Sequence, residues 1–283
     1  STQSRSSAAS DVYKRQLLSR AVPEEQVQSI IIVVHDKEHK ELWERDLAFF
    51  WPNVQVLPFP ITERVEFTTV ARSLEGQGAQ MRALSMLAWN QPVVVLATVE
   101  EVTQYVVSPQ YVVSQSVHLE VSQSIERDEL LEKLVTIGYE RVDQVEQRGH
   151  FSVRGDIFDI FPVNSDDPIR MEFFGDEIDT MRHFSVDTQR SIENVDAYTV
   201  TPFYLTSDDA DSTLLSYAKE GLIIYDEPGR IQEALKKYLK EDATHRKQHC
   251  DWSELQRTVE AKIQVAFTFM QQRSIGLPGF NPI

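Results

Sequence analysis

The sequence predicts an α/β protein in which a parallel sheet with flanking helices is interrupted by an inserted α+β unit. Residues 29–106 alternate short β-branched runs with amphipathic helical patterns, as doubly wound α/β units do. Residues 114–202 carry short alternating segments between glycines, which indicates an antiparallel sheet. The apolar run 222–225 then restores the first pattern, and we expect it to rejoin the first sheet.

The first α/β segment begins with five consecutive β-branched residues, 30–34, which predict a fully buried parallel strand. A helical pattern follows over 38–50 and ends before Pro52. Further along, the pattern predicts a strand over 54–59, a helix over 79–89 and a strand over 93–97.

The middle segment opens with an alternating strand pattern over 116–121. We expect Ser124 to cap a helix over 126–137, and Gly138 to end that helix. Residues 138–190 then predict short strands joined by tight turns, with glycines at the turn positions 149, 155 and 175.

After residue 202 the sequence predicts a buried strand over 222–225 and helices over 230–239 and 252–270. The predicted organisation is a disordered or foreign tail over 1–16, an α/β segment over 17–113, an α+β unit over 114–202, and a second α/β segment over 203–283.

Composition limits the classes of function. The chain has 283 residues and a formal net charge of −16, so its surface repels DNA phosphates on average. No apolar run is long enough to predict a membrane-spanning helix. Cys250 is the single cysteine, which excludes an internal disulfide and a cysteine zinc site. We therefore expect a soluble intracellular protein with no membrane partner.

The run LIIYDE has the form of a Walker B strand, with Asp226 and Glu227 at the end where an ATPase holds magnesium. That chemistry also needs a phosphate-binding loop of the form G-x-x-x-x-G-K-[ST], and no glycine here is followed by Lys-Ser or Lys-Thr. We therefore interpret Asp226 and Glu227 as a degenerate Walker B-like pair and expect no ATPase activity from this chain.

Two histidine pairs have spacings found in metal sites. Residues 35–39, HDKEH, match a zinc-peptidase pattern, but His35 follows a strand and no downstream motif offers a third ligand. His245 and His249 lie among lysines and arginines on a predicted solvated helix. We expect no metal site at either pair.

Three carboxylates of the middle segment, Asp156, Asp159 and Glu172, could suggest acid–base chemistry. Strand alternation places Asp156 and Asp159 on different faces, so a shared catalytic pair is not expected. We predict no catalytic residue in this chain.

Arg154, Arg170, Phe174 and Arg182 have a different character. Arginine binds carboxylates in a bidentate manner, and exposed arginine and aromatic side chains commonly anchor protein interfaces. Alternation places Arg170 and Phe174 on one face. The residues alone leave two interpretations open: a docking surface, or a solvated strand face with Phe174 in the core.

The strings GYERVDQVEQRGHFSVRGDIFDIFP, IRMEFFGDEID and FSVDTQRS resemble the second domain shared by the excision-repair helicase UvrB and the transcription-repair coupling factor family, Mfd. In both, this domain docks the repair protein UvrA. The resemblance implies that the first and last segments form a degenerate RecA-like domain, as in UvrB domain 1. The inserted unit corresponds to the UvrA-interaction domain.

The chain resembles the coupling-factor family more than UvrB. A Walker A motif and a tyrosine-rich DNA-probing hairpin, both typical of UvrB, are missing from the sequence, and residues 57–73 resemble the shorter coupling-factor region. The alternative is a truncated UvrB-like ATP-dependent helicase subunit of the excision nuclease.

The coupling-factor resemblance implies UvrA contacts at Arg154, Arg170 and Phe174, with Phe173 left to the core. It also implies an amino-terminal fragment that acts as a non-catalytic adaptor in the bacterial cytoplasm, with no cofactor of its own. The full family protein is an ATP-dependent DNA translocase that uses ATP and magnesium. It contacts RNA polymerase and duplex DNA through other domains, and its carboxy-terminal domain masks the UvrA site.

Overall fold

The computed structural model describes residues 28–61, 70–203, 210–218, 221–241, 245–259 and 264–267. These residues form two compact units. Unit 1 holds the described residues within 28–61, 86–108 and 210–267, and unit 2 holds those within 70–85 and 109–203. The predicted tail over 1–16 lies outside the described residues, and the predicted segment boundaries stay predictions.

Unit 1 is built on a five-stranded parallel sheet with the order β13-β12-β1-β3-β2. Its strands are β1 (Ser29–Val34), β2 (Val56–Pro58), β3 (Val93–Thr98), β12 (Leu222–Asp226) and β13 (Gln264–Phe267). Every residue of β1 and β3 is buried, as their continuous apolar runs predict. Ile30 pairs with Leu222, so the run 222–225 lies beside the first strand.

The helices of unit 1 are α2 (Lys37–Phe50), α4 (Val99–Thr103), α7 (Pro228–Glu241), α8 (His245–Gln248) and α9 (Trp252–Val259), with a 3-10 turn, η3 (Leu214–Tyr217). Trp43 and Leu47 of α2, together with Trp51, pack on Ile32 and Leu96 of the sheet. This packing follows from the helical spacing of large apolar residues in α2.

Two predictions about unit 1 are wrong. The expected continuous helix over 252–270 ends at Val259, and Gln264–Phe267 instead forms edge strand β13, because it finds hydrogen-bonding partners along β12. His249 is not on a solvated face. It is buried after the end of α8, within 3.3 Å of both the Thr103 hydroxyl and the Tyr238 hydroxyl.

Unit 2 contains a six-stranded sheet with the order β10-β9-β8-β7-β6-β5. The strands are β5 (Glu140–Arg141), β6 (His150–Arg154), β7 (Ile157–Ile160), β8 (Ile169–Phe174), β9 (Glu177–Phe184) and β10 (Ser191–Asn194). Neighbouring strands are antiparallel except β5 and β6. A separate pair joins β4 (Val117–Glu120) to β11 (Ala197–Val200).

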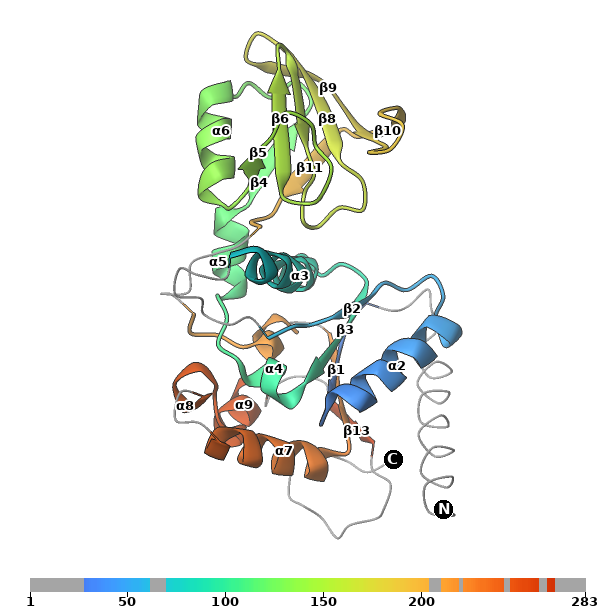
Figure 1. The fold of residues 1–283 in the computed structure, drawn as a ribbon, viewed down its shortest axis with the longest axis vertical. Helices are drawn as coiled ribbons and strands as arrows, with labels where there is room; N and C mark the ends of the chain where they lie inside the picture. The colour runs from blue at the N-terminus through green and yellow to red at the C-terminus, as the bar shows by residue number, and fades with distance from the viewer. Residues whose placement is uncertain are drawn as a thin grey trace. The chain divides into compact units, whose positions relative to one another are not determined.

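Helix α6 (Arg127–Thr136) covers one face of this sheet (Figure 1). Its Leu130 and Leu134 pack with Phe158 and Met171 of the strands in one apolar core. Helix α5 (Pro109–Gln115) precedes β4, and α3 (Val70–Ala88) spans the boundary between the units in the sequence.

The start of α6 differs from the prediction. The N-cap is Glu126, whose side chain makes no capping hydrogen bond. Ser124 instead forms a β-bridge with Glu177 of β9, because the chain is still extended there. Gly138 follows the helix with a φ of +95°, a conformation that favours glycine.

Together, these observations confirm the predicted fold class: a parallel sheet with flanking helices, and an inserted α+β unit. Among the described residues, no helix is both long and apolar enough to cross a membrane.

Candidate protein-docking surface

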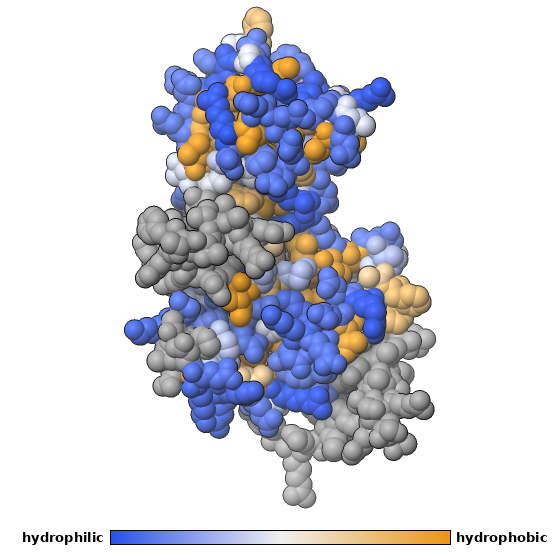
Figure 2. Space-filling model, in the orientation of Figure 1, coloured by the Kyte–Doolittle hydropathy of each residue, from blue (hydrophilic) through white to orange (hydrophobic). Residues whose placement is uncertain are grey.

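The two faces of the unit 2 sheet differ in chemistry. Along β8, Ile169, Met171 and Phe173 are buried in the core beneath α6, while Arg170 and Glu172 alternate with them. The register aligns four polar residues across neighbouring strands, one each from β6, β7, β8 and β9: Ser152, Asp159, Arg170 and Arg182. The face away from the core therefore carries polar side chains. Figure 2 shows unit 2 from one side, where hydrophilic residues predominate and some hydrophobic residues lie among them.

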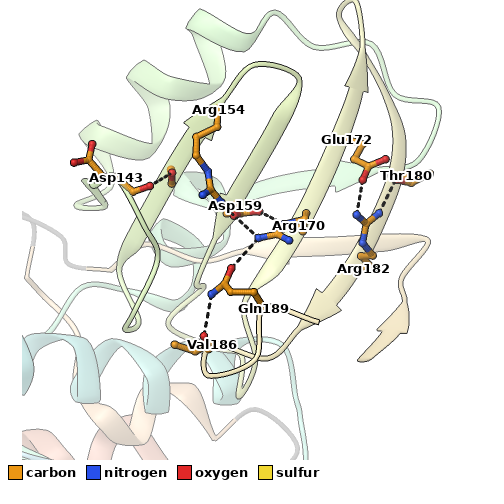
Figure 3. A network of polar contacts seen from close by, with 10 residues as sticks. Asp143, Arg154, Asp159, Arg170, Glu172, Thr180, Arg182, Val186 and Gln189 are labelled. Atoms are coloured by element: carbon orange, nitrogen blue, oxygen red, sulfur yellow. Dashed lines mark hydrogen bonds and ion pairs between the residues drawn. The ribbon is translucent and has the colours of Figure 1, made fainter. Parts of the chain in front are cut away.

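Asp159 is the centre of this surface. Its side chain is buried on β7, between the two neighbouring strands. Each of these strands supplies one arginine that pairs with it, Arg154 from β6 and Arg170 from β8. Both guanidinium groups point toward its carboxylate in Figure 3. A buried carboxylate is tolerated only when paired and hydrogen-bonded, so the two arginines explain its position.

Arg170 makes the stronger of these two contacts. Its Nε and Nη2 donate to the two carboxylate oxygens of Asp159 at 2.7 and 2.8 Å, which is a bidentate ion pair. These hydrogen bonds raise the pKa of the Arg170 guanidinium. Nη2 also donates to Gln189 Oε1 at 3.0 Å, and the guanidinium lies 4.4 Å from the centre of the Phe184 ring.

The exposure of the three predicted docking residues is unequal. The Phe174 residue is 83% exposed, whereas Phe173 is buried, which answers the open question about Phe174: it is not in the core. The Arg154 side chain is 51% exposed and donates to Asp159 through Nη2 at 3.0 Å. The Arg170 side chain is only 14% exposed, so the expectation of a freely exposed arginine at this position is wrong.

A register shift in the β8–β9 hairpin presents Phe174. The pairing slips between Glu172 and Phe173, and the turn follows at Gly175, whose φ is +64°. Phe174 therefore projects near the tip of the hairpin. It lies four residues from Arg170, which is about 13 Å along a strand.

The three carboxylates considered for catalysis pair with arginines, and the described residues bring no three acidic side chains together as a cluster. Asp156 lies in the β6–β7 turn and pairs with Arg127 at 3.2 Å. Glu172 pairs with Arg182, and that hydrogen bond lowers the pKa of Glu172 (Figure 3). Asp159 pairs with Arg154 and Arg170 as described above.

Two supporting residues of this surface were not predicted. Gln189 lies in the β9–β10 connection with a φ of +57°, and its Nε2 donates to the Val186 carbonyl while its Oε1 accepts from Arg170. Phe184 lies beneath the Arg170 guanidinium. The aromatic residue and the amide are far from Arg170 in sequence, so only the strand register brings them together.

The Walker B-like pair lies at the carboxyl end of β12 in unit 1. Asp226 is buried, and the indole Nε1 of Trp43 donates to its Oδ2 at 2.8 Å. Glu227 has a φ of +62°, and its backbone N–H donates to the Phe267 carbonyl. The Asp226 carboxylate therefore already takes part in packing between the sheet and α2.

The neighbouring strand, β1, leads into α2 through two residues, His35 and Asp36. Asp36 is the N-cap of α2, and its side chain accepts from the backbone N–H of His39 at 2.9 Å. The rings of His35 and His39 converge on this same carboxylate. A helix N-terminus can bind an anion, but here the carboxylate of the N-cap residue Asp36 already accepts a hydrogen bond there.

Comparison with known proteins identifies the unit that carries the polar surface. Residues 117–204 match the family described as the UvrB interaction domain. The chain contains a UvrB interaction domain. This match includes the whole polar surface, from Ser152 to Gln189, together with the hairpin that carries Phe174.

Similar proteins extend the match beyond this domain. The chain is 30% identical over 188 residues to the transcription-repair-coupling factor of Bacillus subtilis (strain 168), which covers 66% of this chain and 16% of that protein. It is 31% identical over 186 residues to the transcription-repair-coupling factor of Staphylococcus aureus (strain bovine RF122 / ET3-1), covering 64% and 16%. The Staphylococcus haemolyticus (strain JCSC1435) protein is 29% identical over 194 residues, covering 67% and 16%.

These similarities confirm the resemblance to the coupling-factor family that the sequence motifs indicated. The match spans about 16% of the length of these curated relatives. The UvrA-contacting role of Arg154, Arg170 and Phe174 stays a prediction.

Proposed function

We propose that this chain is a non-catalytic adaptor that docks UvrA in transcription-coupled nucleotide excision repair. One observation carries the proposal: within a UvrB interaction domain, an exposed phenylalanine and a half-exposed arginine lie on a polar sheet face whose centre is a buried ion pair. Its similarity to transcription-repair-coupling factors supports the pathway.

The chemistry of the surface suggests how a partner would bind. Among the described residues, Arg154 hydrogen-bonds through Nη2 alone, so its other N–H donors can reach a carboxylate on the partner. Burying the Phe174 side chain in an apolar pocket would contribute about 1.5–3 kcal/mol. Arg170 and Asp159 would act mainly by holding Arg154 in place.

The test is the affinity of the chain for UvrA, measured by calorimetry, for Phe174→Ala and Arg154→Glu. Each substitution should reduce the binding free energy for UvrA by at least about 2 kcal/mol, which raises Kd roughly 30-fold. Val135→Ala is the matched control, because Val135 is an exposed apolar residue on α6, away from the polar surface. If Phe174→Ala and Arg154→Glu bind UvrA as tightly as the Val135→Ala control, the docking proposal fails.

We further propose that these residues do not bind or hydrolyse ATP. The two-residue link between β1 and α2 offers no glycine-rich loop, and Asp226 accepts a hydrogen bond from Trp43. An equilibrium binding assay with Mg·ATP would decide the point. Saturable binding by the chain would favour the alternative, a UvrB-like helicase subunit.

The remaining activities concern a longer protein of which this chain would be the amino-terminal part. There we propose an ATP-dependent DNA translocase, using ATP and magnesium, that contacts RNA polymerase and duplex DNA through other domains in the bacterial cytoplasm. A carboxy-terminal domain would cover the UvrA-docking surface. Deleting that domain should raise the affinity of the longer protein for UvrA. An unchanged affinity would contradict the masking.

A further inference from the structure

Three potential metal ligands converge where β1 meets α2. These are His35, Asp36 and His39, and one ligand atom from each lies within 4.8 Å of the other two. His35 Nε2 is 3.2 Å from Asp36 Oδ2, and His39 Nδ1 is 2.8 Å from Asp36 Oδ1. The carboxylate therefore lies between the two imidazoles.

We propose that His35, Asp36 and His39 form a zinc-binding site that leaves a fourth coordination position open to water. The sequence offered no third ligand for the histidine pair, and it places the two histidines on different elements. The structure supplies the third ligand from inside the motif, because the short β1–α2 link turns the two imidazoles toward Asp36.

The donor set and spacing fit zinc. Zinc takes imidazole nitrogen and carboxylate oxygen at about 2.0–2.2 Å, so ligand atoms of a tetrahedral site lie about 3.3–3.5 Å apart. In the structure His35 Nε2 lies 3.2 Å from one Asp36 carboxylate oxygen and His39 Nδ1 lies 2.8 Å from the other, so all three side chains are within reach of one ion. The shorter contact is a hydrogen bond, which zinc would replace with metal–ligand bonds. Two nitrogens and one oxygen do not suit magnesium or calcium, which prefer sets of oxygen ligands.

The frame of the site is rigid on one side and open on the other. His35 directly follows a fully buried strand, and the Asp36 carboxylate is held by the backbone N–H of His39. The two histidine side chains are mostly buried, while the Asp36 side chain is 46% exposed, which leaves a route for the ion. Such a preorganised site needs little rearrangement to bind a metal.

Charge and tautomer are also compatible with a bound ion. The Asp36 carboxylate lies between the two imidazoles and would supply negative charge to the ion. In the metal-bound form each imidazole stays neutral and carries its proton on the other ring nitrogen. For His35 that atom is Nδ1, which is buried and has no hydrogen-bond partner among the described residues.

The experiment is a calorimetric titration of the full chain with zinc chloride at neutral pH, with His39→Ala and Asp36→Asn as variants. Asn is also a good N-cap, so Asp36→Asn keeps the start of α2 while removing the charged ligand. Removing a residue that only hydrogen-bonds to a metal ligand typically weakens metal binding roughly 10- to 100-fold. Removing a ligand itself, as in these two variants, should weaken zinc binding by more than that. Circular dichroism checks that both variants fold.

His118→Ala is the matched control, because His118 is an exposed histidine of β4 in unit 2. The proposal expects wild type and His118→Ala to bind one zinc ion with equal affinity and to melt at a higher temperature with zinc present. It is overturned if wild type does not bind zinc, or if Asp36→Asn and His39→Ala bind it as tightly as wild type. In the last case the ion would be held by surface histidines elsewhere.

Discussion

Asp159 and Arg170 lie directly opposite each other on β7 and β8 and are joined by two hydrogen bonds of 2.7 and 2.8 Å. The carboxylate is buried and the guanidinium is nearly so, and Phe184 and Gln189 surround Arg170. This pair therefore stabilises unit 2, whatever part Arg170 plays in the proposed docking of UvrA. Substitutions can separate the stabilising role from the proposed docking role.

Arg170→Glu should destabilise the chain, contrary to what an exposed docking residue would do. The change places a second carboxylate against buried Asp159 and removes its main partner, and breaking such a buried pair typically costs about 3–5 kcal/mol. Urea unfolding of the variant would measure the loss. If Arg170→Glu also loses UvrA binding, that loss can result from unfolding and is not evidence that Arg170 contacts UvrA directly.

Arg154→Glu is the comparison that separates stability from docking. Because the Arg154 side chain is half exposed, its ion pair with Asp159 contributes about 1 kcal/mol or less. We expect near-normal unfolding for Arg154→Glu together with weakened UvrA binding. Equal destabilisation by the two substitutions would contradict the unequal burial of Arg154 and Arg170.

The architecture was predictable because it follows from local patterns. A fully buried strand requires an unbroken apolar run, and β1 and β3 have one. Alternation along β8 correctly separated Arg170 from the buried residues beside it. The strand β13 was missed because four residues at a sheet edge are defined by their pairing with β12, and their own sequence carries only a weak strand signal.

The polar face of the unit 2 sheet, the candidate docking surface, was predictable only in part, because its stability depends on contacts between distant residues. Arginine and phenylalanine at alternating positions indicated a docking face, but nothing local shows that Asp159 lies between two arginines. That contact requires the register of β6, β7 and β8. Asp36 was missed as a possible ligand for a similar reason, since the convergence of His35 and His39 depends on the geometry of the link before α2.

Trp43→Phe should lower stability through the loss of one hydrogen bond to Asp226. A hydrogen bond to a charged group contributes about 1.5–3 kcal/mol when its acceptor is left buried. The free energy of unfolding of Trp43→Phe, measured in urea, gives the loss.

Trp51→Phe is the matched control for Trp43→Phe. Trp51 is buried in the same apolar core, but its Nε1 has no partner among the described residues. Both variants lose a similar volume, so the difference in their free energies of unfolding measures the hydrogen bond. Equal losses would indicate that the bond to Asp226 does not stabilise the fold.

Gly149→Ala should destabilise unit 2 more than Gly155→Ala does. Both glycines have positive φ, +88° and +63°, so each alanine adds about 1 kcal/mol of backbone strain. A Cβ at Gly149 would also come within 2.7 Å of the Phe203 ring, whereas nothing lies within 4 Å of a Cβ at Gly155. Overpacking of this kind typically adds about 1–3 kcal/mol. The two variants are compared by urea unfolding. Because both alanines carry the strain of a positive φ, the difference in their free energies of unfolding measures the contact with the Phe203 ring. Equal free energies of unfolding would show that the Phe203 ring moves away without cost and that the close approach at Gly149 is not a constraint on the fold.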